Sequence, residues 1–188
     1  EKDRHASRTY RRNIQNARKR GIAVFENDIG DVGPAELMSE CGLITGECDL
    51  LLGGPPCQGF SSHRLGSAGG NDPRNELLLR YFTFVKTLKP KFFLVENVPG
   101  LLNPKHAEYL DRFLAIAEES QYRVIGPLML NARDFGVPQN RKRVFILGVS
   151  SELSFDETEW PPRPTHTKPE ATNDTGLLAW RTASDAVA

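Results

Sequence analysis

Residues 48–61 read CDLLLGGPPCQGFS, and this stretch decides how the chain is built. Cys48 to Leu52 is apolar on both faces, which is typical of a buried parallel strand. Two glycines and two prolines then end the strand, because glycine needs no room for a Cβ and proline fixes φ. A lone cysteine is more often a core residue than a nucleophile. Cys57, however, follows a rigid turn at a strand end, which favours a functional thiol.

The rest of the sequence alternates between helical and strand patterns. Apolar periodicity and capping residues predict helices over residues 4–19 and 34–41, from Pro73 or just after it to a point before Pro90, and from Asn103 to about 117. Apolar runs predict strands over residues 22–25, 92–95, 122–130 and 144–149. This alternation predicts an α/β protein with a doubly wound, mostly parallel sheet.

Composition is that of a globular protein. The chain has 188 residues, 39% hydrophobic and 26% charged, which corresponds to about one domain. No apolar run approaches the roughly 18 residues of a membrane span, so we expect no membrane partner. Three cysteines form no disulfide framework, and Cys41 and Cys48 lack paired zinc-ligand spacing. We therefore expect no metal and a reducing compartment, either a prokaryotic cytoplasm, beside the nucleoid, or a nucleus.

Charge is balanced overall and uneven locally. The formal net charge is zero, which excludes a general basic signature for nucleic acid. Basic residues gather within 1–20 and again at 141–143. Such runs are usually solvated faces, and phosphate contact is the alternative.

Polar residues lie where the strands end. Ligands of doubly wound sheets bind beyond the carboxyl ends of the strands, which here are residues 26–29, 53–62 and 96–99. Glu96 is either a helix cap or loop hydrogen bonder, or a buried acid with a raised pKa, and the sequence leaves both open. Arg141 and Arg143 begin a strand, and we expect their side chains on opposite faces, one of them toward the site. A thiol, an acid and a cation together suit an electron-poor planar substrate.

Three motifs make a family resemblance specific. GGPPCQGFS (53–61), ENVPG (96–100) and LNARDFGVPQNRKRVF (130–145) resemble, in order and spacing, the catalytic motifs of cytosine-C5 DNA methyltransferases. The resemblance covers roughly residues 1–150. It implies a Rossmann-like S-adenosylmethionine-dependent methyltransferase fold acting on double-stranded DNA.

The resemblance also assigns catalytic roles. Cys57 matches the nucleophile that adds to C6 of a flipped-out cytosine. Glu96 matches the acid at N3 and Arg143 the cation near O2, while C5 receives the methyl group of S-adenosyl-L-methionine. Residues 58 to about 71 match a mobile lid. Supporting roles fall to three residues: Asn97, Gln139 and Arg141.

For the cofactor, Glu1 matches the acid that binds the ribose hydroxyls. Asp28 and Ile29 match residues that contact the adenine, and Pro56 and Leu77 match further contacts. We expect the family's glycine-rich loop to precede Glu1, and the target-recognition domain and the late motifs to lie outside this sequence as well.

We therefore expect an incomplete sheet, with a partial catalytic domain over 1–150 and a linker over 151–188 leading toward an absent target-recognition domain. Without the family's first strand, the strand ending at Leu52 would have an unpaired apolar edge. The remainder of the enzyme, on the same or a separate chain, would complete the cofactor pocket.

Two alternatives stay open beside DNA methylation. One is a tRNA cytosine-5 methyltransferase of the same family, and the other is a non-catalytic partner chain of a split enzyme. Gly59 resembles the DNA branch, and the presence of Cys57, Glu96 and Arg143 argues against a non-catalytic role. Restriction-modification is favoured over an epigenetic role.

Overall fold

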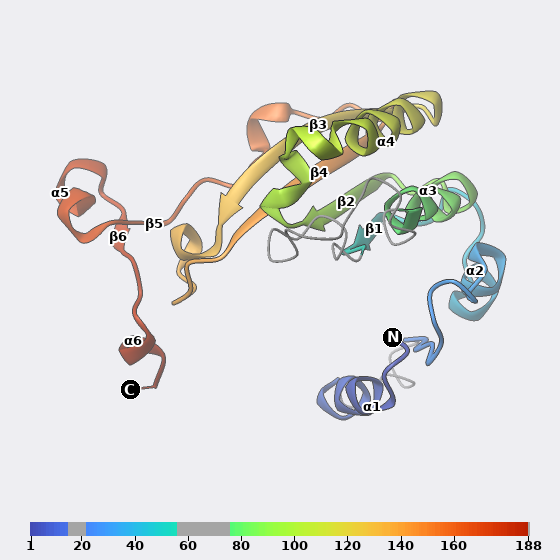
Figure 1. The fold of residues 1–188 in the computed structure, drawn as a ribbon, viewed down its shortest axis with the longest axis horizontal. Coiled ribbons are helices and arrows are strands. Elements are labelled where there is room, and N and C mark those ends of the chain that lie inside the picture. Colours follow the sequence, from blue (N-terminus) through green and yellow to red (C-terminus); the bar gives the residue numbers. More distant parts are fainter. Residues whose placement is uncertain (15–21, 56–75, 188) are drawn as a thin grey trace.

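A four-stranded sheet forms the centre of the protein (Figure 1). The computed structural model describes residues 1–14, 22–55 and 76–187. The sheet has the order β1-β2-β4-β3. Its strands are β1 (Leu50–Gly53), β2 (Phe92–Asn97), β3 (Tyr122–Asn131) and β4 (Lys142–Ser150). The predicted strands 92–95, 122–130 and 144–149 are thus confirmed, each slightly longer than expected.

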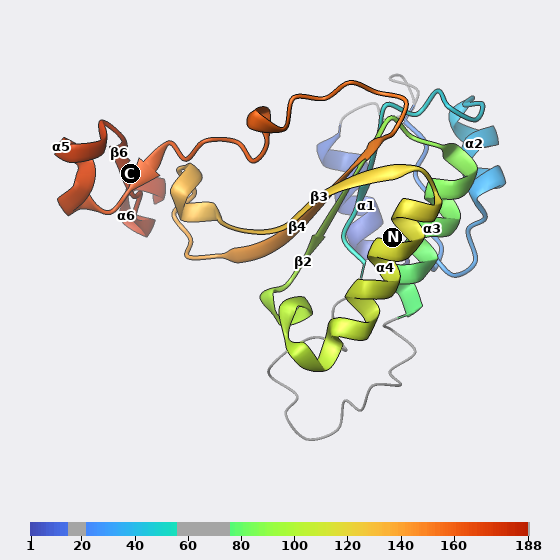
Figure 2. The same ribbon diagram turned by 90° about the horizontal axis from the view of Figure 1, so that it is seen from above.

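Two helices cover one face of this sheet (Figure 2). They are α3 (Glu76–Leu88) and α4 (Ala107–Glu119), both at predicted positions. Phe82 of α3 and Phe113 of α4 meet with ring centroids 4.7 Å apart, and both rings pack on Phe93 of β2. Because alternate strand residues face one side, Phe93, Val95, Val144 and Ile146 all enter this core.

Short 3-10 turns bring the chain from β2 to α4. These are η3 (Pro99–Leu102) and η4 (Pro104–His106). Asn103 caps η4, and its side chain accepts a hydrogen bond from the backbone nitrogen of Lys105 at 3.2 Å. The predicted Asn-Pro start is therefore confirmed, although one 3-10 turn precedes the α-helix.

The sheet is mixed, which corrects the expected mostly parallel arrangement. β1 and β2 are parallel, whereas β4 runs antiparallel to both β2 and β3. Only residues 132–141 join β3 to β4. A connection this short suits an antiparallel return and is too short for a parallel crossover.

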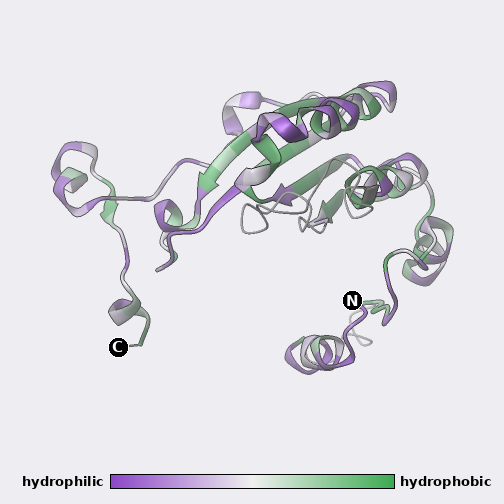
Figure 3. Ribbon diagram, viewed as in Figure 1, coloured by the Kyte–Doolittle hydropathy of each residue, from purple (hydrophilic) through white to green (hydrophobic). Residues whose placement is uncertain are grey.

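β1 lies at the edge of the described sheet and is less buried than the sequence predicted. Leu50 is 48% exposed and Leu52 is 65% exposed, because β1 pairs with β2 only. Figure 3 shows that the strands of this sheet are mainly green, which marks apolar residues. An apolar edge of this kind is a surface that another segment could cover.

The N-terminal part contains α1 (Arg4–Asn13) and α2 (Pro34–Cys41). A helix was expected over 4–19, but α1 ends at Asn13 with Ile14 as its C-cap; residues 15–19 of that prediction lie outside the described ranges. Residues 22–25 form no strand, so that prediction is wrong. The carbonyls of Val24 and Phe25 accept bonds from Arg11 and from the backbone nitrogen of Glu1 instead of pairing in a sheet.

After β4, the turn η6 (Glu157–Glu159) lies beside the start of β3, where Nε of Arg123 is 3.0 Å from Oε1 of Glu157. Residues 165–187 then form a small C-terminal unit beyond the end of β3 and the start of β4 (Figure 1). Its elements are β5 (His166–Thr167), η7 (Pro169–Ala171), α5 (Thr172–Thr175), β6 (Leu178–Ala179) and α6 (Ala183–Val187). β5 and β6 pair as a two-stranded parallel sheet. Within the described ranges, no helix is long and apolar enough to cross a membrane.

Candidate active site

A cavity of about 230 Å³ opens where β2 ends and β4 begins. Glu96 points into it from β2, opposite Phe145 of β4 in the strand register. Apolar side chains make up most of the wall. The lining residues are Glu96, Leu130, Ala132, Phe135, Arg141, Arg143, Phe145 and Pro162.

Two arginines share one carboxylate oxygen in this cavity. Nε of Arg143 lies 2.8 Å from Oε1 of Glu96, and Nη2 of Arg141 lies 3.8 Å from the same oxygen. The side chains of Glu96 and Arg143 are 37% and 22% exposed. Glu96 is therefore an ion-paired, half-buried carboxylate rather than a loop cap or a fully buried acid.

The expectation that Arg141 and Arg143 point to opposite faces is wrong. Side chains two residues apart in extended backbone lie on the same face, because the strand repeat is two residues. Both guanidinium groups therefore reach Glu96. The site holds two cations around one anion, which suits a substrate that gains negative charge as it reacts.

Backbone hydrogen bonds close the loop that carries Arg141. The nitrogen of Ala132 donates to the carbonyl of Arg141 at 3.0 Å. The nitrogen of Arg141 donates to the carbonyl of Gln139, also at 3.0 Å. Gln139 itself is exposed and lies outside the cavity lining, so its backbone shapes the loop.

Asn97 joins the ends of β1 and β2. It is 2% exposed, and its Nδ2 donates to the carbonyl of Pro55 at 3.4 Å. Its Oδ1 accepts from the nitrogen of Val98 at 2.9 Å. This places Asn97 behind the backbone that runs toward Cys57, which, like Pro56, falls outside the described residues.

The described backbone before Cys57 passes beside the acid. A Cβ built on Gly54 would lie 3.9 Å from Oε2 of Glu96. A Cβ on Gly53 would lie 2.3 Å from Cε2 of Tyr81. The first glycine of the turn is therefore needed for close approach to an aromatic ring, a role that the sequence did not reveal.

Tyr81 holds the end of β1 in place. Its hydroxyl donates to the carbonyl of Leu51 at 2.7 Å, and its ring packs edge-on against Phe93. Burial raises the pKa of Tyr81 above its ordinary value, so the side chain remains a neutral donor. Sequence reasoning missed this residue because its partners lie on other elements.

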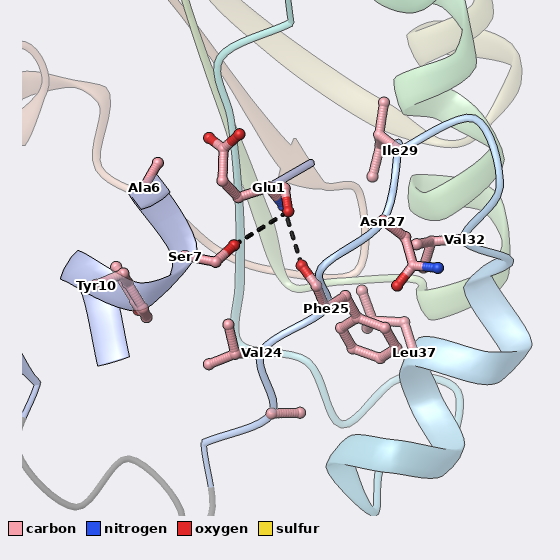
Figure 4. Close-up of a pocket in the computed structure, with 11 residues that line it drawn as sticks. Glu1, Ala6, Ser7, Tyr10, Val24, Phe25, Asn27, Ile29, Val32 and Leu37 are labelled. Carbon is pink, nitrogen blue, oxygen red and sulfur yellow. Dashed lines mark hydrogen bonds between the residues drawn. The ribbon is translucent and has the colours of Figure 1, made fainter. Parts of the chain in front are cut away.

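A second cavity, of about 430 Å³, lies between α1, residues 23–29 and α2 (Figure 4). Glu1 and Ile29, two of the predicted cofactor residues, both line it. Its other lining residues are Ala6, Ser7, Tyr10, Ala23, Val24, Phe25, Asn27, Val32 and Leu37.

Two other predicted cofactor residues, Asp28 and Leu77, are not among the residues that line this cavity. Asp28 is absent from this lining, and its carboxylate is 3.0 Å from Nζ of Lys2. The Gly30 N–H and Lys2 hold the pKa of Asp28 below its usual value. Leu77, on α3, is also outside the lining. Arg80 of the same helix, which sequence reasoning missed, donates to the carbonyls of Ile29 and Gly30.

The donor set of this second cavity fits the adenosine part of a nucleoside cofactor. Glu1 supplies a carboxylate that can accept from ribose hydroxyls, and Ile29, Val32 and Leu37 supply apolar surface for a base. Within residues 1–14, 22–55 and 76–187, no three metal-ligating side chains lie together.

Sequence comparison decides the family. The model of the C-5 cytosine-specific DNA methylases matches residues 1–182. The chain belongs to this family. Of the three motifs quoted above, the first begins at the last residue of β1 and the second begins with the last two residues of β2. The third supplies most of the residues that line the cavity with Glu96.

Two curated relatives illustrate the sequence similarity, and both are type II methyltransferases of bacteria. The type II methyltransferase M.AgeI of Thalassovita gelatinovora is 41% identical over 145 residues, which cover 77% of this chain and 32% of that protein. M.NgoFVII of Neisseria gonorrhoeae is 34% identical over 97% of this chain and 44% of that protein. The chain thus spans about a third to under half of the length of these relatives.

Solved structures agree with the fold. A prophage-encoded protein of E. coli, described as a DNA modification methyltransferase, superposes with a TM-score of 0.71 and 26% identity over 100% of this chain and 46% of that one. DNMT2 of Spodoptera frugiperda, at 22% identity and a TM-score of 0.57, shares the fold. The protein therefore has an α/β methyltransferase fold built on a mixed sheet.

Proposed function

We propose that this chain is the catalytic part of a DNA cytosine-5 methyltransferase that uses S-adenosyl-L-methionine. The observation that supports this most directly is the Glu96–Arg143 pair, 2.8 Å apart, in an apolar-walled cavity beside the backbone that leads to Cys57. Membership of the C-5 cytosine-specific DNA methylase family gives the reaction class.

The charges around the cavity suit thiolate addition to cytosine. In the proposal, the sulfur of Cys57 bonds to C6 and the electron pair of the C5–C6 bond moves toward N3 and O2. Glu96, in its protonated form, would hydrogen-bond N3, and Arg143 would stabilise charge at O2. C5 then bonds to the methyl group supplied by the cofactor, and loss of the C5 proton restores the double bond as sulfur leaves.

In the proposal, Glu96 and Arg143 are paired with each other before the substrate binds. Nε of Arg143 lies 2.8 Å from Oε1 of Glu96, a distance typical of a charge-assisted hydrogen bond. A cytosine in the cavity would compete for both groups, its N3 with the carboxyl and its O2 with the guanidinium. Arg141, at 3.8 Å, would remain as the supporting cation, and Asn97 would hold the turn.

The cofactor would be held by the second cavity, with Glu1 at the ribose and Ile29 at the base. Asp28, Pro56 and Leu77 stay predictions as cofactor contacts. The apolar edge of β1 supports a further part of the proposal, because Leu50 and Leu52 need a cover. We infer that the rest of the enzyme, on the same or another polypeptide, pairs along β1 and adds target recognition beyond residues 151–188.

Bacterial type II relatives support a restriction-modification setting, with duplex DNA in the cell as the substrate. The test is methyl transfer from labelled cofactor to duplex DNA and to tRNA, with the complete protein. Cys57→Ser should abolish transfer to DNA, whereas Cys41→Ser, at an exposed free cysteine, should retain it. Transfer that survives Cys57→Ser would refute the covalent mechanism, and transfer to tRNA alone would establish the RNA alternative.

A further inference from the structure

The 3-10 turn η5 (Ala132–Phe135) has different neighbours on its two sides. On one side, Ala132 and Phe135 line the cavity that contains Glu96. On the other, Arg133 and Asp134 contact the C-terminal unit. A single turn therefore separates the proposed active site from residues more than thirty positions further along the chain.

Trp180 makes the main contacts on the outer side. Its Nε1 donates to Oδ1 of Asp134 at 2.9 Å. The guanidinium carbon of Arg133 lies 3.7 Å from the centre of the Trp180 ring, which is a cation–π distance. One indole thus contacts two consecutive residues of η5, through its edge and through its face.

Two more contacts fix the same side of η5. The nitrogen of Thr165 donates to the carbonyl of Asp134 at 2.9 Å. Gly136, at φ +84°, packs against the ring of His166, and a Cβ there would lie 2.7 Å from Cε1. His166 is only 8% exposed, so this contact is closely packed.

The contact with η5 also stabilises the C-terminal unit. β5 and β6 are two residues each, and a sheet of that size is not stable alone. The nitrogens of Leu178 and Trp180 donate to the carbonyls of Thr165 and Thr167, which ties Trp180 to the strand that bonds Asp134. The two-stranded sheet and η5 therefore form one interlocked contact.

Hydrogen bonds then connect η5 and the residue before it to the segment that carries Arg141. The nitrogen of Ala132 donates to the carbonyl of Arg141 at 3.0 Å, and Nδ2 of Asn131 donates to Oδ1 of Asn140 at 2.8 Å. The position of η5 thus sets the position of the backbone that presents Arg141 to Glu96. A shift of about 1 Å at a site of this kind is enough to impair catalysis.

We propose that Trp180 and Asp134 are positioning residues for methyl transfer, which hold η5 against the cavity so that Arg141 and Arg143 face Glu96. This role rests on the proposed function. It also means that whatever moves the C-terminal unit would change the catalytic cavity through η5.

The test uses the complete protein and conservative replacements. Trp180→Phe keeps a ring over Arg133 and removes the indole N–H, and Asp134→Ala removes the acceptor. Each should lower kcat for DNA methylation about fivefold, the usual effect of one lost hydrogen bond, with KM for the methyl donor unchanged. Asp134→Asn keeps an oxygen acceptor and should restore kcat to within about twofold of wild type.

A matched control is available in the chain. Nε1 of Trp160 is buried and has no hydrogen-bond partner among the described residues, so Trp160→Phe should leave kcat within about twofold. Amide hydrogen exchange gives a second readout that does not need activity. In Trp180→Ala, exchange should accelerate over residues 131–141 and stay unchanged in α4.

Unchanged exchange over residues 131–141 in Trp180→Ala would overturn the inference. Equal acceleration in α4 would also overturn it, because the effect would then be general destabilisation. If the wild-type protein transfers no methyl group and exchange still accelerates only at 131–141, the proposed function fails while the contact between Trp180 and η5 stands.

Discussion

Replacing Gly53 by alanine should damage the protein far more than replacing its neighbour Gly54. The new Cβ at position 53 would lie 2.3 Å from Cε2 and 2.7 Å from Cδ2 of Tyr81. Tyr81 cannot easily withdraw, because it is 8% exposed and packs edge-on against Phe82 and Phe93. Either the ring or the end of β1 must move.

Both movements have a cost that the structure lets us estimate. Overpacking a core typically costs about 1–3 kcal/mol. Displacing Tyr81 also breaks its 2.7 Å hydrogen bond to the carbonyl of Leu51, worth about 1 kcal/mol. We expect Gly53→Ala to lower the free energy of unfolding by about 2–4 kcal/mol. The turn toward Cys57 should shift with β1, so methyl transfer should fall as well.

The assay is equilibrium unfolding in urea, followed by far-UV circular dichroism, for three variants. Gly54→Ala places its Cβ 3.9 Å from Glu96, an ordinary contact, and should change stability by less than about 0.5 kcal/mol. Tyr81→Phe keeps the ring and measures the lost hydrogen bond alone. If Gly53→Ala proves as stable as Gly54→Ala, the reasoning about close approach is refuted.

Three further predictions concern the site and the core. Glu96→Gln should lower the single-turnover rate of methyl transfer about 100-fold or more while duplex binding in a gel-shift assay persists. Arg143→Lys should reduce kcat about tenfold, and Arg141→Lys should reduce it less, because Arg143 is the closer partner of Glu96. Equal reductions in kcat would contradict this geometry. Burial raises the pKa of Tyr122 from 10.0 to about 12. As the pH rises, the tyrosine hydroxyl therefore loses its proton in the unfolded chain before it does so in the folded protein. The free energy of unfolding should fall by up to about 2–3 kcal/mol between pH 10 and 12, and a Tyr122→Phe variant should lack this pH-dependent decrease.

Much of the fold could be predicted because the relevant signals are local. The apolar stripe of α4 and the capping role of Asn103, at the turn η4 just before α4, are visible in the sequence, and the structure confirms both. The run Phe92 to Val95 also reads as a buried strand, since its residues are apolar on both faces. Each of these elements depends on residues that are close together in the chain.

Predictions failed where the outcome depended on distant partners. Residues 22–25 have a strand-like sequence, but their carbonyls bond to α1 and Glu1, and no described strand pairs with them. The side on which Arg141 lies was mispredicted although the two-residue repeat of extended backbone could have indicated it. Whether the sheet is parallel or mixed depends on the short return between β3 and β4, which periodicity does not report.

The sequence by itself determined the family, the order of the catalytic motifs and the elements that carry them, because these depend on residue types at short spacing. Only the tertiary structure brought Glu96, Arg141 and Arg143 into one cavity, since β2 and β4 become neighbours by pairing over about fifty residues. It also showed why position 53 requires glycine, because the ring of Tyr81 on α3 leaves no room there for a Cβ. Contacts between distant segments decide such features, and local sequence patterns do not indicate which segments will meet.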